Sequence, residues 1–262
     1  MIFRLMIVVV SVLAAPAHAE TPEEKGLRIA VEADQEDTGF GDSEVSMVMV
    51  LRNRHGEESV RSFRTSTLEV AGDGDKSLAI FDEPADIKGT ALLTYSHKRG
   101  SDDQWLYLPA LKRVKRLSSE NKSGSFVGSE FAYEDLSSQE VEKYTYRWLA
   151  DEPCPGAEEL ACWLIERIPV DEESGYTRQR LWIDQPEYRA WKIDFYDRKD
   201  ALLKTLTFAD WREYLGRYWR AQRMRMVNHQ TGKSTDLAFD TFAFRTGLTD
   251  RDFDQKALSR AR

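Results

Sequence analysis

The sequence predicts a mainly β protein that forms one domain of about eleven antiparallel strands. Three observations lead to this prediction. Segments with apolar residues at every second position recur along most of the chain, short connections rich in Gly, Pro, Asn and Asp separate them, and helical patterns occur only near the two ends of the mature chain. A meander of so many strands must curl or close to protect its edge strands.

The N-terminus has the composition of a cleaved secretory signal. A charged start at Arg4 precedes an apolar run that is too short for a membrane span, and Ala17 and Ala19 are the small residues that precede a cleavage site. We expect residues 1–19 to be removed and residues 20–262 to form a single periplasmic domain; an uncleaved anchor helix is the alternative. The residue at the expected cleavage point is Glu20 and not cysteine, so the sequence does not indicate a lipid anchor.

The overall charge limits the partners of the protein. The formal net charge is −8, and an acidic protein is a poor general binder of nucleic acid or of anionic membrane surfaces. No later segment reaches the length of a membrane span. We therefore expect no binding of nucleic acid and no stable membrane insertion, and we expect a monomer.

The first predicted element of the mature chain is an amphipathic helix over residues 21–33. Thr21 and Pro22 are typical of a helix start, and apolar positions recur among Glu and Lys residues after them. The acidic, glycine-containing segment 34–42 is expected to end this helix.

The next elements are strands. Residues 44–51 have a period of two, with one strongly apolar face that consists of Val45, Met47, Met49 and Leu51. Residues 58–69 return as the second strand of a hairpin. Further strands are predicted at residues 77–81, 90–96 and 104–108.

The second half of the chain alternates more regularly. Its predicted strands are residues 144–149, 161–168, 177–183, 188–196, 202–208, 218–227 and 236–244. Turn-forming residues separate them. Residues 249–258 are predicted to form a C-terminal helix that begins at the capping residue Thr249.

The two cysteines of the chain, Cys154 and Cys162, predict a disulfide in an exported protein. By the chain-entropy model, so short a loop contributes roughly 2.5 kcal/mol, which is enough to hold a hairpin together. Neither cysteine has a second ligand at metal-binding spacing, and the histidines show no ligand pattern, so we expect neither a metal nor a cofactor.

No catalytic motif is complete. The segment from Gly232 to Thr235 resembles the end of a phosphate loop, but Val227 stands where the earlier glycine is required. The segment 124–128 resembles a nucleophile elbow, but its central residue is Phe126 and not serine. We therefore expect a protein that is not an enzyme; the alternative is an envelope hydrolase with a nonstandard site.

One loop combines a mobile composition with aromatic residues. Residues 118–128 are polar and contain glycine, and Phe126, Phe131 and Tyr133 follow within or just after them. Such a loop is typical of a lid over a binding site. The alternative is that the rings simply plug the end of a barrel.

A basic cluster precedes this loop in an otherwise acidic chain. It consists of Lys112, Arg113, Lys115 and Arg116, which we call the basic patch. One interpretation is a docking surface for acidic partners or lipid headgroups. The other is a solvated edge strand, whose charges prevent aggregation.

These segments also resemble a known family. The similar segments are Trp105-Leu-Tyr-Leu-Pro109, Lys112-Arg-Val-Lys-Arg116 and Asn121-Lys-Ser-Gly-Ser-Phe-Val-Gly-Ser-Glu-Phe-Ala-Tyr-Glu-Asp-Leu136. They resemble the signature of the outer membrane lipoprotein-sorting proteins, which are relatives of the periplasmic carrier LolA and the receptor LolB. The resemblance implies an open, half-closed antiparallel β-barrel with a hydrophobic cavity under helical lids.

The resemblance also implies a function. We expect a periplasmic carrier that binds the acyl chains of lipoproteins or other lipids for transfer toward the outer membrane, with an inner-membrane RND-type transporter as a partner. The alternative is a module that bridges or regulates an envelope complex without carrying lipid. The expected cavity and lid residues are Val45, Met47, Met49, Leu51, Phe81, Leu93, Trp105, Tyr107, Phe126, Phe131 and Tyr133.

Overall fold

The computed structural model describes residues 19–118 and 121–260. Nearly all of the expected signal segment, residues 1–18, lies outside the described residues.

The chain begins with helix α1, Pro22–Asp37. Its start is fixed by a capping box, because the Thr21 side chain accepts a hydrogen bond from the Glu24 amide and the Glu24 carboxylate accepts one from the Thr21 amide. The helix extends beyond the predicted end. Glu36 and Asp37, which have no apolar periodicity, form ion pairs with Arg217 in the turn before the strand Tyr218–Asn228 and with Arg220 on that strand.

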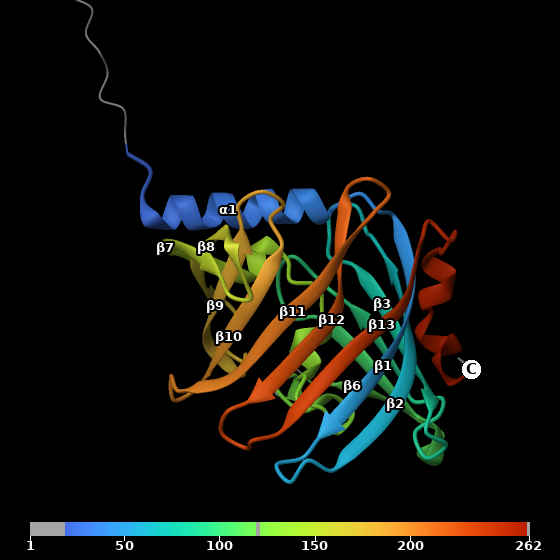
Figure 1. The fold of residues 1–262 in the computed structure, drawn as a ribbon. Coiled ribbons are helices and arrows are strands. Elements are labelled where there is room, and N and C mark those ends of the chain that lie inside the picture. Colours follow the sequence, from blue (N-terminus) through green and yellow to red (C-terminus); the bar gives the residue numbers. More distant parts are fainter. Residues whose placement is uncertain (1–18, 119–120, 261–262) are drawn as a thin grey trace, which may run out of the picture.

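In the described ranges thirteen antiparallel strands form one sheet, somewhat more than the sequence predicts. They are β1 Asp42–Arg52, β2 Glu58–Leu68, β3 Lys76–Glu83, β4 Ala91–Tyr95, β5 Asp103–Leu108, β6 Arg113–Leu117, β7 Tyr144–Cys154, β8 Ala157–Pro169, β9 Tyr176–Asp184, β10 Ala190–Asp197, β11 Leu202–Tyr214, β12 Tyr218–Asn228 and β13 Ser234–Phe244. The order across the sheet is β6-β5-β4-β3-β2-β1-β13-β12-β11-β10-β9-β8-β7. The pairing of β1 with β13 joins the two halves of the chain (Figure 1).

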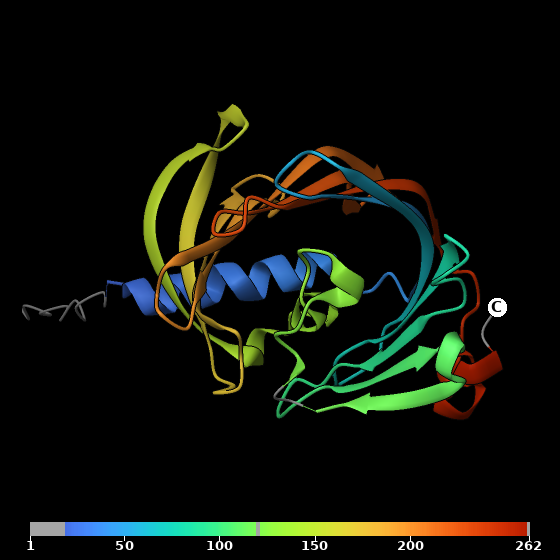
Figure 2. The same cartoon turned by 90° about the horizontal axis from the view of Figure 1, so that it is seen from below.

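The sheet curves into an arch, which Figure 2 shows end-on. Within the described residues the two edge strands, β6 and β7, do not pair with each other, so the barrel is half-closed, as expected. Helix α1 lies across one open end of the arch (Figures 1 and 2). Residues 121–143, which we call the plug segment, lie in the hollow and contain the 3-10 turns η3 Phe126–Gly128, η4 Tyr133–Leu136 and η5 Val141–Lys143.

Helix α1 lies very close to strand β7. An added Cβ at Gly26 would stand 2.7 Å from the carbonyl carbon of Arg147, so only glycine allows this approach. One turn further on, Ile29 is fully buried in the main core. The Lys25 ammonium lies 3.7 Å from the centre of the Trp148 ring. These contacts fix the helix along one rim of the arch.

The C-terminal helix predicted from Thr249 forms as two 3-10 turns, η6 Asp250–Phe253 and η7 Gln255–Arg260. The predicted cap is present, but Asp254 between the turns has an extended backbone conformation and interrupts a continuous helix. The turns cover the outer face of the sheet next to β6 (Figure 2), where Phe253 and Leu258 are buried.

Candidate functional site

A cavity of about 850 Å³ lies between α1 and the concave face of the sheet. Ala30 and Ala33 form its helical side, and their small side chains leave the space open. Its apolar walls on the sheet include Val45, Ile165, Leu181, Ile183, Ile193, Phe208, Met224 and Phe242. A volume of this size lies in the range typical of sites for small organic molecules.

The rim of the cavity near the C-terminal end of α1 is charged. Arg220 forms an ion pair with Asp37, and Arg217 approaches Glu36 at 3.6 Å, so the helix end is joined to β12 and the turn before it. Asp75 also lines the cavity. Burial, together with nearby carboxylates, raises the pKa of Asp75 to about 7.

Most of the expected site residues pack into the main core and not around the cavity. Val45 lines the cavity. The residues that share the main core with it are Met47, Met49, Phe81, Phe126 and Phe131, with Leu51 and Tyr133 packed against them. The structure thus brings these eight residues together, but seven of them fill the half-barrel next to the cavity.

Leu93, Trp105 and Tyr107 lie elsewhere than expected. They form part of a second cluster with Phe253 and Leu258, on the face of the sheet opposite the cavity. Side chains alternate between the two faces of a strand, and the C-terminal turns bury this outer face, so both faces of β4 and β5 are apolar. The sequence pattern alone could not separate the inner face from the outer one.

The aromatic loop is buried inside the half-barrel. Phe126 is 1 % exposed. Its ring lies 5.4 Å from the ring of Phe81, 5.9 Å from that of Tyr133 and 6.4 Å from that of Phe63, as measured between ring centroids. The loop therefore has the packing of a plug.

Buried polar contacts hold the plug segment to the sheet. The Lys204 ammonium lies 2.6 Å from the Asp135 carboxylate and donates a hydrogen bond to the Glu130 carbonyl at 2.9 Å. The Tyr176 hydroxyl donates to Asp135 at 2.7 Å, and the Asn228 amide donates to the Glu130 carboxylate at 2.7 Å. Sequence reasoning missed these contacts, because each acidic residue has its partner at least 41 positions away.

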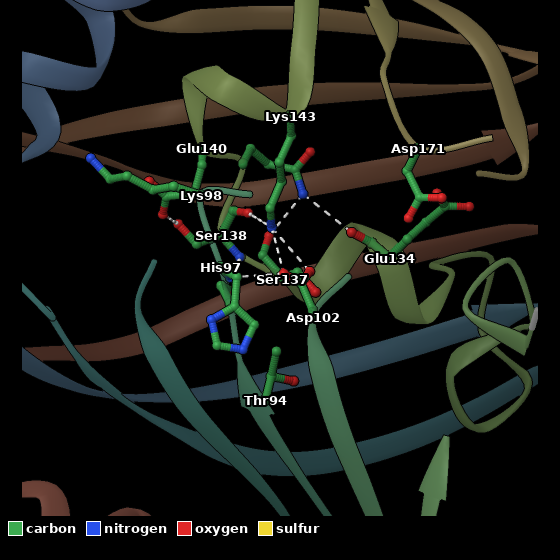
Figure 3. Close-up of polar contacts among 12 residues, drawn as sticks. Thr94, His97, Lys98, Asp102, Glu134, Ser137, Ser138, Glu140, Lys143 and Asp171 are labelled. Carbon is green, nitrogen blue, oxygen red and sulfur yellow. Dashed lines mark hydrogen bonds and ion pairs between the residues drawn. The ribbon is translucent and has the colours of Figure 1, made fainter. Parts of the chain in front are cut away.

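A second, smaller pocket of about 180 Å³ lies on the other side of the plug segment. In Figure 3, the Lys143 ammonium donates to the Asp102 carboxylate at 3.0 Å and to the Ser138 carbonyl at 2.7 Å. The Glu134 carboxylate accepts hydrogen bonds from the Ser174 hydroxyl and the Gly175 amide, and burial raises the pKa of Glu134. The polar groups of this pocket form hydrogen bonds and an ion pair with one another, and these contacts hold the plug segment to the sheet at a second place.

One buried cation on the cavity wall has no carboxylate partner among the residues that the structure describes. Arg167, on β8, is 7 % exposed and lines the cavity. Its guanidinium donates to the side-chain oxygens of Gln179 at 2.8 Å and Gln139 at 3.1 Å, and it lies 4.1 Å from the centre of the Tyr144 ring. Sequence reasoning missed it, because an arginine next to Glu166 in a strand is usually a surface residue.

The basic patch is exposed on the edge of the sheet. Arg113, Lys115 and Arg116 belong to β6, and Lys112 precedes it in a left-handed backbone conformation. Arg116 forms an ion pair with Asp103 on the neighbouring strand. The edge-strand position fits both interpretations of the patch.

The predicted disulfide between Cys154 and Cys162 is formed, and its Cα atoms are 5.0 Å apart. It packs against Trp182 in a small separate cluster. Within residues 19–118 and 121–260, no group of three or more His, Cys, Asp or Glu residues is placed to hold a metal ion. No helix in the same ranges is long and apolar enough to cross a membrane.

Several known proteins are similar to this chain in sequence, in fold or in both. A protein-family model described as that of an uncharacterized protein matches residues 73–260. A domain from Vibrio parahaemolyticus, assigned as an outer membrane lipoprotein-sorting protein, is 57% identical, with 91% of this chain and 100% of that chain covered and a TM-score of 0.88. No curated protein sequence matches the chain.

Two further crystal structures are similar. A DUF1329 family protein from Desulfovibrio piger is 32% identical, with 91% of this chain and 99% of that chain covered and a TM-score of 0.84. A LolA superfamily protein from Nitrosomonas europaea is 21% identical, with 88% of this chain and 98% of that chain covered and a TM-score of 0.71. The last comparison concerns the fold alone.

Proposed function

Because this chain belongs to the outer membrane lipoprotein-sorting protein family and has the LolA fold, we propose that it carries acyl chains of lipoproteins or other lipids through the periplasm. The observation that carries the proposal is the cavity of about 850 Å³ between α1 and the concave face of the sheet. Its apolar walls match a hydrocarbon chain, and the small residues of α1 leave room for one. The signal-like N-terminus supports the periplasmic location.

The energy available in such a cavity is sufficient for transport. Burying an acyl chain contributes roughly 0.8 kcal/mol per methylene, so a long chain offers on the order of 10 kcal/mol before the cost of ordering it. Carrying an acyl chain requires no catalytic group, because the protein only has to shield the chain from water. The polar contacts that fix the plug segment keep the core filled next to the cavity, so the cavity can remain open without collapse of the half-barrel.

The cavity can be tested by filling it from the helix. Ala30 lines the cavity, whereas Leu27 on the same helix is 46% exposed to solvent. We expect Ala30→Trp to lower the affinity for a dansyl-labelled C16 fatty acid at least tenfold, because the indole occupies the volume of the chain. Leu27→Trp is the matched control and should bind like the wild type.

Two results would contradict the proposal. One is wild-type protein that shows no saturable binding of the labelled fatty acid. The other is Ala30→Trp protein that is folded by circular dichroism and binds as tightly as the wild type.

We further propose that the basic patch docks an acidic surface of an inner-membrane RND-type exporter, which would deliver the lipid. Within the described residues, Arg113 and Lys115 have no ion-pair partner, so their charges are available. Exchanging both for Glu should abolish cross-linking to such an exporter in membranes at low salt, whereas Arg223→Glu on β12 should not. Equal cross-linking by both variants would exclude the patch as the docking surface.

A further inference from the structure

The buried charge of Arg167 has no counterpart within the described part of the chain. Lys204, the other cationic residue buried to this degree, pairs with Asp135 at 2.6 Å. Arg167 instead contacts two neutral amide oxygens and an aromatic ring. A buried cation is costly unless an anion compensates it, so this site is electrostatically incomplete.

Three carboxylates on or beside the plug segment are committed to other groups. Asp135 accepts from Lys204 and Tyr176, and Asp102 forms an ion pair with Lys143. Glu134 accepts from Ser174 and from the Gly175 amide. None of these carboxylates contacts the guanidinium, so the charge of Arg167 faces the cavity without its own anion.

The guanidinium also has unused hydrogen-bonding capacity. An arginine carries five N–H donors in a planar fork that matches a carboxylate or a phosphate. Two of the five are used, one toward Gln179 and one toward Gln139. The remaining donors lie at a cavity whose wall continues along the same strand to Ile165 and across it to Leu181. An anionic group beside an apolar wall is the arrangement that an amphiphile requires.

A purely structural role does not account for the charge. Arg167 helps to hold Gln139 of the plug segment, but Gln139 also accepts a hydrogen bond from the Tyr144 hydroxyl at 2.5 Å and donates to the Ser137 carbonyl at 2.8 Å. A neutral donor would serve that purpose without the cost of burying a cation.

We propose that the cavity binds an acyl ligand with an anionic head, a carboxylate or a phosphate, which Arg167 holds while the hydrocarbon chain lies along the apolar wall. This inference rests on the proposed function and names the class of ligand. It predicts that an acyl chain with a charged head binds better than the same chain with a neutral head.

The test compares three ligands with the same C16 chain by displacement of the dansyl-labelled fatty acid from the full mature protein. Palmitate presents a carboxylate, palmitoyl lysophosphatidic acid presents a phosphate, and methyl palmitate is neutral. A charge-assisted hydrogen bond predicts that at least one anionic ligand binds about 10- to 100-fold more tightly than methyl palmitate. The anionic ligand that shows the preference identifies the source of the head group.

Two variants assign the preference to Arg167. Arg167→Gln should abolish it. Gln179→Glu, which supplies an internal carboxylate to the guanidinium with little change of shape, should abolish it as well and guards against a folding defect in the first variant. Arg180→Gln is the matched control, because Arg180 on β9 pairs with Glu166 on the opposite face and should leave the preference unchanged.

The outcomes separate this inference from the proposed function. If methyl palmitate binds the wild type as tightly as both anionic ligands, or if both Arg167→Gln and Gln179→Glu keep the preference, the anion site is refuted and the acyl cavity stands. If none of the three ligands displaces the probe, and the probe itself does not bind, both proposals fail.

Discussion

Replacing Lys204 by Met tests whether the plug segment is a fixed part of the fold. The change removes the ammonium that contacts Asp135 and the Glu130 carbonyl, while the length and apolar stem of the side chain are largely kept. The Asp135 carboxylate then remains inside the protein with the Tyr176 hydroxyl as its remaining side-chain donor.

The size of the effect follows from the burial of the pair. The side chains of Lys204 and Asp135 are 4% and 6% exposed, so solvent cannot compensate the lost charge. Removing one partner of such a pair typically costs 3–5 kcal/mol, and the Tyr176 hydrogen bond places the expected loss at about 3 kcal/mol. Arg223→Met, at an exposed ion pair with Asp210, should cost less than about 1 kcal/mol.

Urea denaturation gives the free energy of unfolding of each variant, and limited proteolysis reports whether residues 121–143 become accessible in the native state. We expect Lys204→Met to unfold at lower urea concentration and to be cut within the plug segment, and the Arg223 variant to do neither. A loss below about 1 kcal/mol for Lys204→Met, without new cleavage, would show that the plug segment does not depend on the buried pair.

Three other predictions follow from the structure. Phe126→Ala should cost about 3–5 kcal/mol in urea denaturation because its ring is fully packed, and a cost below about 1 kcal/mol would indicate a mobile lid. The raised pKa of Asp75 means that the native state binds more protons than the unfolded state between pH 3.8 and about 7, so the free energy of unfolding falls as pH rises through this window, by at most about 1.4 kcal/mol per pH unit. Asp75→Asn should therefore reduce the difference in unfolding free energy between pH 5 and pH 8. An unchanged difference would contradict the raised pKa of Asp75. Replacing Cys154 and Cys162 by Ser should lower the free energy of unfolding by roughly 2.5 kcal/mol, and an unchanged value would show that the disulfide does not stabilise the β7–β8 hairpin.

The alternation of apolar residues predicted most of the fold, because a strand with one buried face leaves a period of two in the sequence. Strand β6 was missed for the same reason. Arg113, Val114, Lys115 and Arg116 are all exposed, so the strand has no buried face to leave a pattern. The capping residues Thr21 and Thr249 located both helical starts, since these caps depend only on local hydrogen bonds.

The candidate site was harder to predict because it depends on contacts between distant residues. Trp105 is an aromatic strand residue like those of the main core, yet it faces the C-terminal turns, whose position the sequence does not encode locally. The pair of Asp135 with Lys204 spans 69 positions, and the charge of Arg167 stands out only once the surrounding side chains are known. Charged residues are normally solvent-exposed, and nothing in the local sequence marks Asp135, Lys204 or Arg167 as buried.

The most direct test of the central claim is native mass spectrometry of the protein purified from the periplasm without detergent. We predict a bound acyl lipid at about one molecule per protein in the wild type and in Leu27→Trp, and its loss in Ala30→Trp. Wild-type protein that is free of lipid, yet still binds an inner-membrane partner, would contradict carriage and favour a module that bridges an envelope complex.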